Sequence, residues 1–274
     1  MKSLFSNRNF FFGFTITIIL SLCALAAPFL SGYDPIVDAD LAYALVPPNT
    51  EFWMGTDQYG RDILSRILYG SRISLSIGII VQLINSVIGI SLGLCAGYFG
   101  GFIDDIVMGL TNIMLSMPPI ILSLAIMVVL GPGIINLYIA LGLIGWTYTC
   151  RVARGEALSI RERQFTEAAR AQGTGHIKII FRHILPNTLG PVVVIATLGV
   201  ADAILTAATL GFLGLGVQPP SPELGAMLSQ GRDYIWNAPW LCIFPGLTIS
   251  LVVLGLNLLG DGIRDVIDPH MQDV

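Results

Sequence analysis

Charged residues are scarce in this chain: only 12% of its 274 residues are Asp, Glu, Lys or Arg, whereas 54% are hydrophobic. A soluble domain carries about 25% charged residues, so there is too little charge here to cover a water-facing surface. Most of the protein must therefore face lipid rather than water. The net charge of −4 is small and does not indicate a nucleic-acid partner.

Lysine is rarer still, since Lys2 and Lys178 are the only two. The usual phosphate-binding loop requires Gly-x-x-x-x-Gly-Lys-Ser/Thr, and neither lysine stands in such a context. The chain is therefore not expected to bind ATP in the usual way, and any process driven by ATP would need another polypeptide.

Metal and disulfide chemistry also lack support in the sequence. The cysteines have no CxxC spacing and fall in or beside apolar runs, which predicts small buried side chains rather than ligands. We expect no metal and no cofactor in this chain. The four cysteines are Cys23, Cys95, Cys150 and Cys242.

Long apolar stretches fill most of the sequence. A helix needs about 20 apolar residues to cross a bilayer, so we expect an all-α integral membrane protein with six spans in a single domain over residues 1–274. A polar loop at 152–190 separates the fourth span from the fifth. The expected spans are 10–30, 73–97, 106–130, 135–151, 191–215 and 241–259.

The first span has an alternative interpretation as a secretory signal. Lys2 and Arg8 precede it, and Ala24-Leu25-Ala26 resembles a signal-peptidase site. The apolar run is longer than a usual signal core, which favours an uncleaved helix.

Basic residues predict the orientation, because cytoplasmic loops carry an excess of Lys and Arg. Six spans place both chain ends on one side of the membrane. Ten of the 14 basic residues fall on that side, together with the loop at 152–190. Both termini and this loop are therefore expected in the cytoplasm.

A polar, helix-prone segment at 156–172 interrupts the apolar pattern with Glu, Ala, Leu, Arg and Gln. Gly173 and Gly175 are expected to end the helix and to form a tight turn. A second helical stretch is expected from 176 to about 184. Pro186 follows it and would end this helix.

The first of these two helices would present a surface to a partner. Ala168, Ala169 and Ala171 would form a low-profile face, with Glu167 and Arg170 at its flanks. An ordinary basic loop that only fixes topology is an equally good explanation on physical grounds.

The spacing of this segment resembles the motif of permease subunits of ABC importers, which reads Glu-Ala-Ala, three residues, Gly, and then Ile and Leu-Pro. Here it is carried by Glu167, Ala168, Ala169, Gly173 and the run 184–186. In that family the loop docks on an ATPase subunit and transmits its closure, so the resemblance implies a coupling role that includes Arg170. Ile184 lies next to Leu185-Pro186, where the general motif leaves one residue between.

Further motifs resemble the dipeptide/oligopeptide/nickel branch of these permeases, and the "C" type in particular. They cover nearly the whole chain in order. They are Met-Gly-Thr-Asp-Gln-Tyr-Gly-Arg-Asp-Ile-Leu-Ser-Arg at 54–66, Gly-Tyr-Phe-Gly-Gly at 97–101, Gly-Phe-Leu-Gly-Leu-Gly at 211–216, and Gly-Asp-Gly-Ile-Arg-Asp at 260–265 with Asp268-Pro269.

The resemblance implies a type I ABC importer permease fold in a bacterial inner membrane. Its implied partners are a second homologous permease, two ATP-binding subunits or domains that hold ATP and Mg, and an external binding protein. Alternating access would move dipeptides or oligopeptides, or alternatively nickel or a metal chelate. A self-sufficient secondary transporter is an alternative of another class, but it would need coupling-ion carboxylates in the spans.

Asp202 is the one acidic residue near the middle of a span. An ionisable group there is costly and indicates a pathway or a polar partner rather than lipid. Asp202 is our candidate for the translocation path, and a structural hydrogen bond between helices is the alternative.

No catalytic residue is expected. The run Gly89-Ile90-Ser91-Leu92-Gly93 matches the nucleophile-elbow pattern, but the three histidines all lie outside the spans, so no base is available. Gly89, Gly93 and Gly97 fall at intervals of four and instead predict close helix packing.

Two external segments are candidate contact surfaces. The pattern at 61–73 predicts an amphipathic helix on the outer membrane face, with its arginines toward water. Residues 219–223 and 230–236 are expected to form a docking surface for a partner, stiffened by prolines.

Overall fold

The computed structural model describes residues 7–267, and within them the chain forms helices and no strand. The expected all-α class is therefore confirmed. Lys2, His270, the Asp268-Pro269 pair and the placement of both chain ends lie outside the described residues. The helices are α2 (Arg8–Leu25), α3 (Ala27–Leu30), α4 (Ile63–Phe99), α5 (Gly101–Leu115), α6 (Pro119–Leu130), α7 (Ile134–Arg161), α8 (Gln164–Ala171), α9 (His176–Ile179), α10 (Leu185–Phe212), α11 (Leu224–Gly231) and α12 (Trp240–Ile267), with short turns η1 (Leu41–Tyr43), η2 (Ile180–Ile184) and η3 (Arg232–Tyr234).

The expected count of six spans is not confirmed. Among the described residues four helices are long and apolar enough to cross a membrane, namely α2, α4, the continuous helix His176–Phe212, and α12; the bent pair α5–α6 gives up to five. The helix α7, which covers the expected fourth span, is not among them, and its C-terminal half carries Arg151, Arg154 and Glu156.

The expected third span, 106–130, is not one straight helix. The helices α5 and α6 meet at an angle of 89°. Pro118 and Pro119 stand at the break, and proline has no N–H to continue the helical ladder. The apolar run at 106–130 is continuous across this break and therefore predicted a single span.

The helix α4 begins earlier than expected and absorbs the predicted amphipathic segment at 61–73. It has 37 residues and is therefore about 55 Å long. Asp62 caps its first turn, where the carboxylate accepts a hydrogen bond from the Ser65 N–H at 2.7 Å. The expected placement of the arginines toward water is wrong for Arg61 and Arg66, which are 4% and 1% exposed, whereas Arg72 is exposed.

The glycines of α4 pack closely against α7, as their spacing predicts. A Cβ on Gly93 would lie 2.5 Å from the Cys150 carbonyl oxygen, and one on Gly97 would lie 2.6 Å from the Arg154 carbonyl oxygen. A Cβ on Gly89 would lie 2.6 Å from the Thr149 Cβ. Only glycine permits this approach of the two backbones. Ser91 is exposed on another side of α4.

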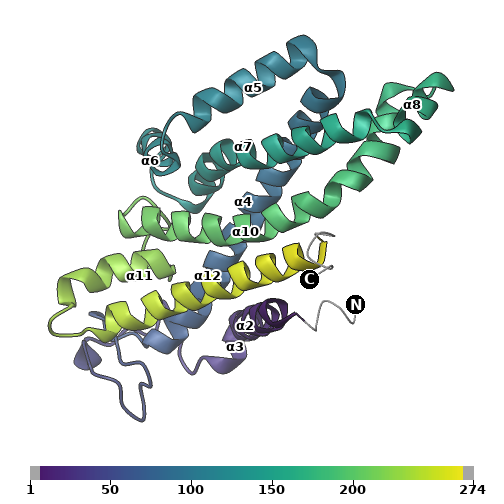
Figure 1. The fold of residues 1–274 in the computed structure, drawn as a ribbon. Helices are drawn as coiled ribbons and strands as arrows, with labels where there is room; N and C mark the ends of the chain where they lie inside the picture. The colour runs from purple at the N-terminus through teal and green to yellow at the C-terminus, as the bar shows by residue number, and fades with distance from the viewer. Residues whose placement is uncertain (1–6, 268–274) are drawn as a thin grey trace.

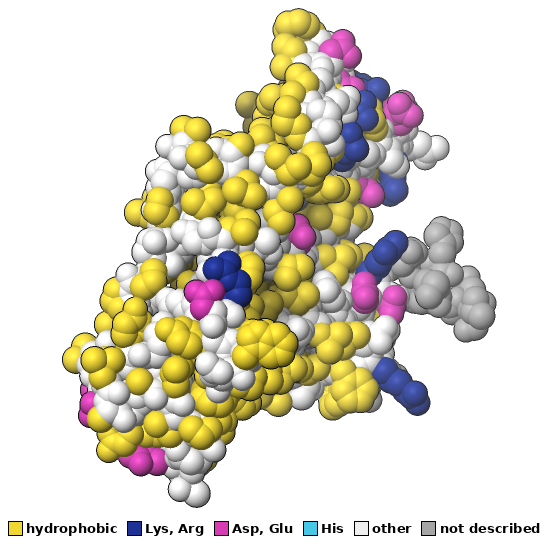
Figure 2. All heavy atoms as spheres, turned by 90° about the vertical axis from the view of Figure 1, so that its left-hand side faces the viewer, with side chains coloured by type: hydrophobic (Ala, Val, Ile, Leu, Met, Phe, Trp, Pro, Cys, Tyr) yellow, Lys and Arg dark blue, Asp and Glu magenta, His cyan; other side chains and the backbone are white. Residues whose placement is uncertain are grey.

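The helices run between two ends of the molecule (Figure 1). One end carries α8, and the opposite end carries the segment 31–62 together with α11. The helix α4 packs on α7 and α10, and α12 packs on α2 and α10. Hydrophobic side chains cover most of the face in Figure 2, and most of its visible Lys and Arg side chains gather along one edge.

Candidate functional site

A polar hairpin, defined as residues 162–184, projects from the end of α7. The expected helix at 156–172 is interrupted, because α7 runs on to Arg161 and α8 begins only at Gln164. Gly173 follows α8 with a φ of +77°, in the left-handed region that favours glycine. The chain then turns into α9 at His176.

The faces of α8 differ from the expected alanine surface. Glu167, Ala168 and Arg170 are exposed, but Ala169 is only 9% exposed and packs into the core with Tyr98 and Ile179. Ala169 is therefore an inward contact and not part of an outer surface. The exposed side of the hairpin instead includes apolar side chains, which are Phe165, Ile177 and Phe181.

The hairpin is fastened to the end of α4. The Tyr98 hydroxyl lies 2.8 Å from the His176 Nδ1, and the Arg170 guanidinium lies 5.5 Å from the centre of the Tyr98 ring, as in a cation–π contact. Arg161 donates to the Gly97 carbonyl oxygen at 3.1 Å. The sequence motif at 97–101 marked this segment, but its contact with the hairpin comes only from the fold.

The hairpin also continues directly into α10. Pro186 was expected to end the second helical stretch, but it lies in the first turn of α10. A π-helical turn at Ile180–Ile184 joins α9 to α10, so one helical rod runs from His176 to Phe212. Proline is tolerated in a first turn, where its missing N–H is not needed. The expectation that Pro186 ends the helix is therefore wrong.

A cavity of about 620 Å³ lies between α4, the end of α5, α6, α7 and α10. Asp202 of α10 lines it, together with polar groups from each neighbouring helix. Among the described residues the Asp202 carboxylate has no hydrogen-bond or ion-pair partner. The structure thus offers no interhelical hydrogen bond to explain this residue. The other polar lining residues are Gln82, Asn85, Ser123, Thr147, Tyr148, Thr149 and Thr206.

Two amide side chains of α4 that line this cavity pack closely against glycines of the facing helices. The Gln82 side chain lies against Gly199 of α10, and the Asn85 side chain lies against Gly145 of α7, so that a Cβ on either glycine would overlap the amide. Asn85 is 5% exposed, and its Oδ1 has no hydrogen-bond partner. A buried acceptor without a partner is costly.

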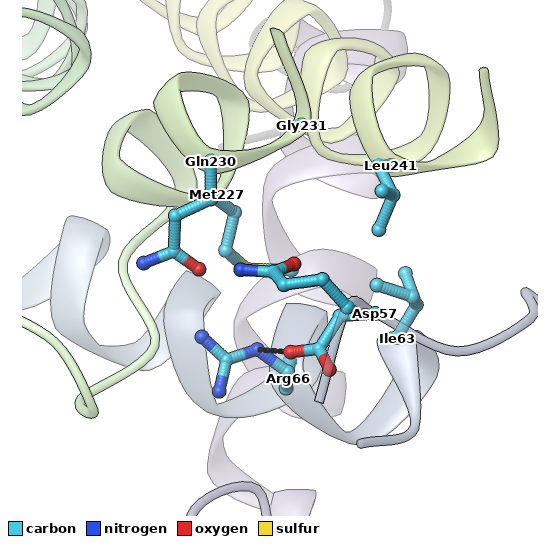
Figure 3. Close-up of a pocket in the computed structure, with 8 residues that line it drawn as sticks. Asp57, Ile63, Arg66, Met227, Gln230, Gly231 and Leu241 are labelled. Carbon is cyan, nitrogen blue, oxygen red and sulfur yellow. Dashed lines mark ion pairs between the residues drawn. The ribbon is translucent and has the colours of Figure 1, made fainter. Parts of the chain in front are cut away.

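At the opposite end, the buried Asp57 carboxylate pairs with Arg66 (Figure 3) and also with Arg61. The Asp57 Oδ2 lies 2.7 Å from the Arg61 Nε and 3.5 Å from the Arg66 Nε. Its Oδ1 accepts hydrogen bonds from the backbone N–H groups of Tyr59 and Arg61. Arg66 also donates to the Pro35 carbonyl oxygen at 2.8 Å. This cluster fastens the segment 31–62 to the start of α4.

The expected docking surface at 219–223 and 230–236 is only partly exposed. Trp236 is 93% exposed, but Glu223 is 2% exposed. The Glu223 carboxylate caps α11 by accepting from the Gly225 and Ala226 N–H groups at 2.9 and 2.8 Å. Burial raises the pKa of this carboxyl, while these backbone donors and Ser74 oppose the rise. Glu223 is therefore a structural cap and not a contact for a partner.

Comparison with known proteins identifies the class of this molecule. Residues 89–273 match the family model of the binding-protein-dependent transport system inner membrane component. The chain belongs to this family. Residues 1–48 of the permease also match the N-terminal TM domain of oligopeptide transport permease C.

Curated relatives span nearly the whole permease. It is 45% identical to the dipeptide transport system permease protein DppC of Alkalihalophilus pseudofirmus, over 99% of this chain and 89% of that protein. It is 41% identical to the di/tripeptide transport system permease protein DppC of Pseudomonas aeruginosa, over 99% and 91%. It is also 41% identical to the glutathione transport system permease protein GsiD of Pectobacterium atrosepticum, over 93% and 85%.

The fold agrees with a solved importer. The inward-facing MetNI methionine ABC transporter matches with a TM-score of 0.61 and 21% identity, over 74% of this chain and 96% of that chain. The permease is thus a multi-pass transport subunit of an ABC importer and not an enzyme, and the ATPase resides in separate subunits. It acts in a complex with ATPase subunits and a substrate-binding protein.

Proposed function

We propose that this permease imports dipeptides and short oligopeptides across a bacterial inner membrane by ATP-driven alternating access. Three of the relatives most similar to it are named as dipeptide or di/tripeptide permeases. It would pair with a second homologous permease and with two ATP-binding subunits or domains that hold ATP and Mg. Both termini and the polar hairpin would lie in the cytoplasm.

The observation that carries this proposal is the continuity between the hairpin and the cavity. The rod from His176 to Phe212 includes both the hairpin's second arm and Asp202. Tyr98 ties the same hairpin to α4 through His176. Arg161, at the end of α7 just before the hairpin, also donates to α4, and Gln82 and Asn85 of α4 line the cavity. A push on the exposed residues of α8 would therefore reach two walls of the cavity through continuous helices.

The partner contact on the hairpin is expected at Glu167, Ala168, Arg170 and the turn at Gly173. Their exposure leaves these residues free to meet an ATPase subunit. Ala169 would contribute by fixing α8 against the core, since it is buried there. The apolar side chain of Phe165 would add contact area on the same element.

Uptake into sealed vesicles tests the proposed cargo and the energy source. We expect labelled alanyl-alanine to accumulate only when the permease is assembled with its partner permease, its ATPase subunits, the binding protein and ATP. Labelled nickel, offered alone or as a chelate, is the alternative cargo. Accumulation of nickel but not peptide would contradict the peptide assignment, and uptake driven by an ion gradient without ATP would indicate a secondary transporter.

The turn at Gly173 gives a test of coupling. We expect Gly173→Val to lower peptide uptake at least about tenfold while the complex still assembles, because a left-handed residue with a Cβ costs about 1–2 kcal/mol and a β-branched one more. The turn has open space around it, so the effect would come from backbone strain and not from a clash. Uptake and ATP hydrolysis stimulated by the loaded binding protein are measured on the same preparation.

Gly175→Val is the matched control for this turn. Gly175 is also exposed and has open space, but its φ is −62°, which any residue adopts. We expect this variant to keep uptake and stimulated hydrolysis near the wild-type level. Normal stimulated hydrolysis with normal uptake in Gly173→Val would contradict the coupling role of the turn.

A further inference from the structure

We propose that Asp202 pairs with the ammonium group of the cargo peptide, and that Gln82 and Asn85 read the adjacent peptide amide. The inference rests on the proposed peptide import and adds which end of the cargo this subunit recognises. It assigns to the cavity a specificity for a primary ammonium group next to an amide.

The charge of the cavity is the first argument. Asp202 is the only ionisable acid or base besides Tyr148 among the described residues that line it, and no Lys, Arg or His is present there. Its carboxylate has no partner among the described residues. The Asp202 side chain is exposed in the described chain and lines the cavity, so a cation in the cavity would be held by charge as well as by hydrogen bonds.

The position of the two amides is the second argument. Gln82 and Asn85 lie one turn apart on α4, and Gln82 rests on Gly199, which is one turn before Asp202 on α10. Gln82, Asn85 and Asp202 all line the cavity. A peptide whose ammonium group meets Asp202 would carry an amide close to its first residue, and side-chain amides such as those of Gln82 and Asn85 can both donate to and accept from such a group.

The size of the cavity is the third argument. Its volume of about 620 Å³ lies within the roughly 300–1,000 Å³ of small-molecule sites. The rest of the lining is largely apolar, with Met114, Leu141, Ile144 and Ile195 among the contributors. Such walls accept varied side chains, while the polar groups fix the orientation of the peptide main chain.

A metal ion is a poorer occupant of this cavity. The described residues contain no group of three or more His, Cys, Asp or Glu side chains that could hold a metal ion. Asp202 supplies one carboxylate, whereas divalent metals take several ligands from a protein. A single carboxylate beside amides suits an ammonium group instead.

The test uses the assembled complex in lipid nanodiscs without its binding protein, so that the selectivity of the binding protein does not enter. Saturation-transfer NMR measures contact of alanyl-alanine and of N-acetyl-alanyl-alanine with wild type, Asp202→Asn, Asp202→Glu and Asp105→Asn. Asp105 is an exposed carboxylate on α5 that does not line the cavity. We expect alanyl-alanine to bind wild type and Asp105→Asn alike, and the acetylated peptide to bind neither.

For Asp202→Asn we expect at least about tenfold weaker binding of alanyl-alanine, since a hydrogen bond to a charged group is lost. Asp202→Glu keeps the charge and should retain more affinity than Asp202→Asn. In vesicles with the binding protein, Asp202→Asn should transport less peptide for each ATP hydrolysed.

Three results would overturn the inference. They are equal binding of the acetylated peptide, unchanged binding and uptake in Asp202→Asn, and loss of the second permease from the Asp202→Asn complex, which would make Asp202 a subunit contact. If wild type takes up no peptide at all, the proposed function fails instead. Wild-type uptake therefore tests the function, and the variants test the role of Asp202.

Discussion

Gly93→Leu is expected to abolish assembly of a stable permease complex. A Cβ at this position would lie 2.5 Å from the Cys150 carbonyl oxygen and 2.8 Å from the Ala153 Cβ. Backbone atoms cannot move aside as a flexible side chain can, so α4 and α7 would have to separate along the whole glycine stripe. Overpacking of a core costs about 1–3 kcal/mol, occasionally more, and here the separated helices also form two walls of the cavity.

The yield of monodisperse complex and its thermal denaturation midpoint measure this effect. Gly109→Leu is the control, because Gly109 lies in α5 and a Cβ at that position would have no neighbouring atom within 4 Å. We expect the control to change the stability by no more than about 0.5 kcal/mol, as for an ordinary surface substitution. Equal denaturation midpoints for the two variants would show that the glycine stripe does not set the distance between α4 and α7.

Asp57→Ala is expected to release the segment 31–62 from α4 and to destabilise the protein by about 3–5 kcal/mol, the usual cost of removing one partner of a buried ion pair. The side chains of Asp57, Arg61 and Arg66 are 3%, 5% and 1% exposed. The substitution would leave two buried guanidinium groups without their shared counter-charge. The Nη2 atoms of both arginines already lack partners, and the hydrogen bonds that Arg66 would keep go to the neutral carbonyl oxygens of Pro35 and Pro220.

The exposed pair Arg232–Asp233 supplies the control for this prediction. Its side chains are 62% and 71% exposed, and such surface pairs contribute about 0–1 kcal/mol. Thermal denaturation and limited proteolysis within 31–62 should therefore separate Asp57→Ala from Asp233→Ala. Resistance of Asp57→Ala to proteolysis at the wild-type level would show that other contacts hold this segment.

Local patterns predicted the features that depend on helical geometry alone. Intervals of four placed Gly89, Gly93 and Gly97 on one side of α4, where α7 meets them. The excess of apolar residues predicted membrane helices, and the Gly173 turn has the left-handed φ expected of a helix end. Each of these signals is contained within a few turns of one segment.

Other predictions were wrong because a distant segment changed the meaning of a local pattern. The arginines at 61–73 were placed toward water, but Asp57 and the Pro35 carbonyl oxygen bury Arg66. Ala169 was assigned to an outer face, but it is buried in a core cluster that includes Tyr98 of α4 and Ile179 of α9. Pro118 and Pro119 indicate a bend between α5 and α6. The continuous hydropathy of 106–130 nevertheless favoured one straight span over these residues.

The sequence by itself determined that this is a helical membrane permease with a polar hairpin, because hydropathy, charge and motif spacing are properties of the chain order. Only the tertiary structure decided that the hairpin is tied to Tyr98 and continuous with α10, and that Asp202 shares a cavity with Gln82 and Asn85. These contacts join α4 to residues about 80–120 positions later in the chain. Helix packing brings them together, and no local pattern encodes which distant side chains will meet.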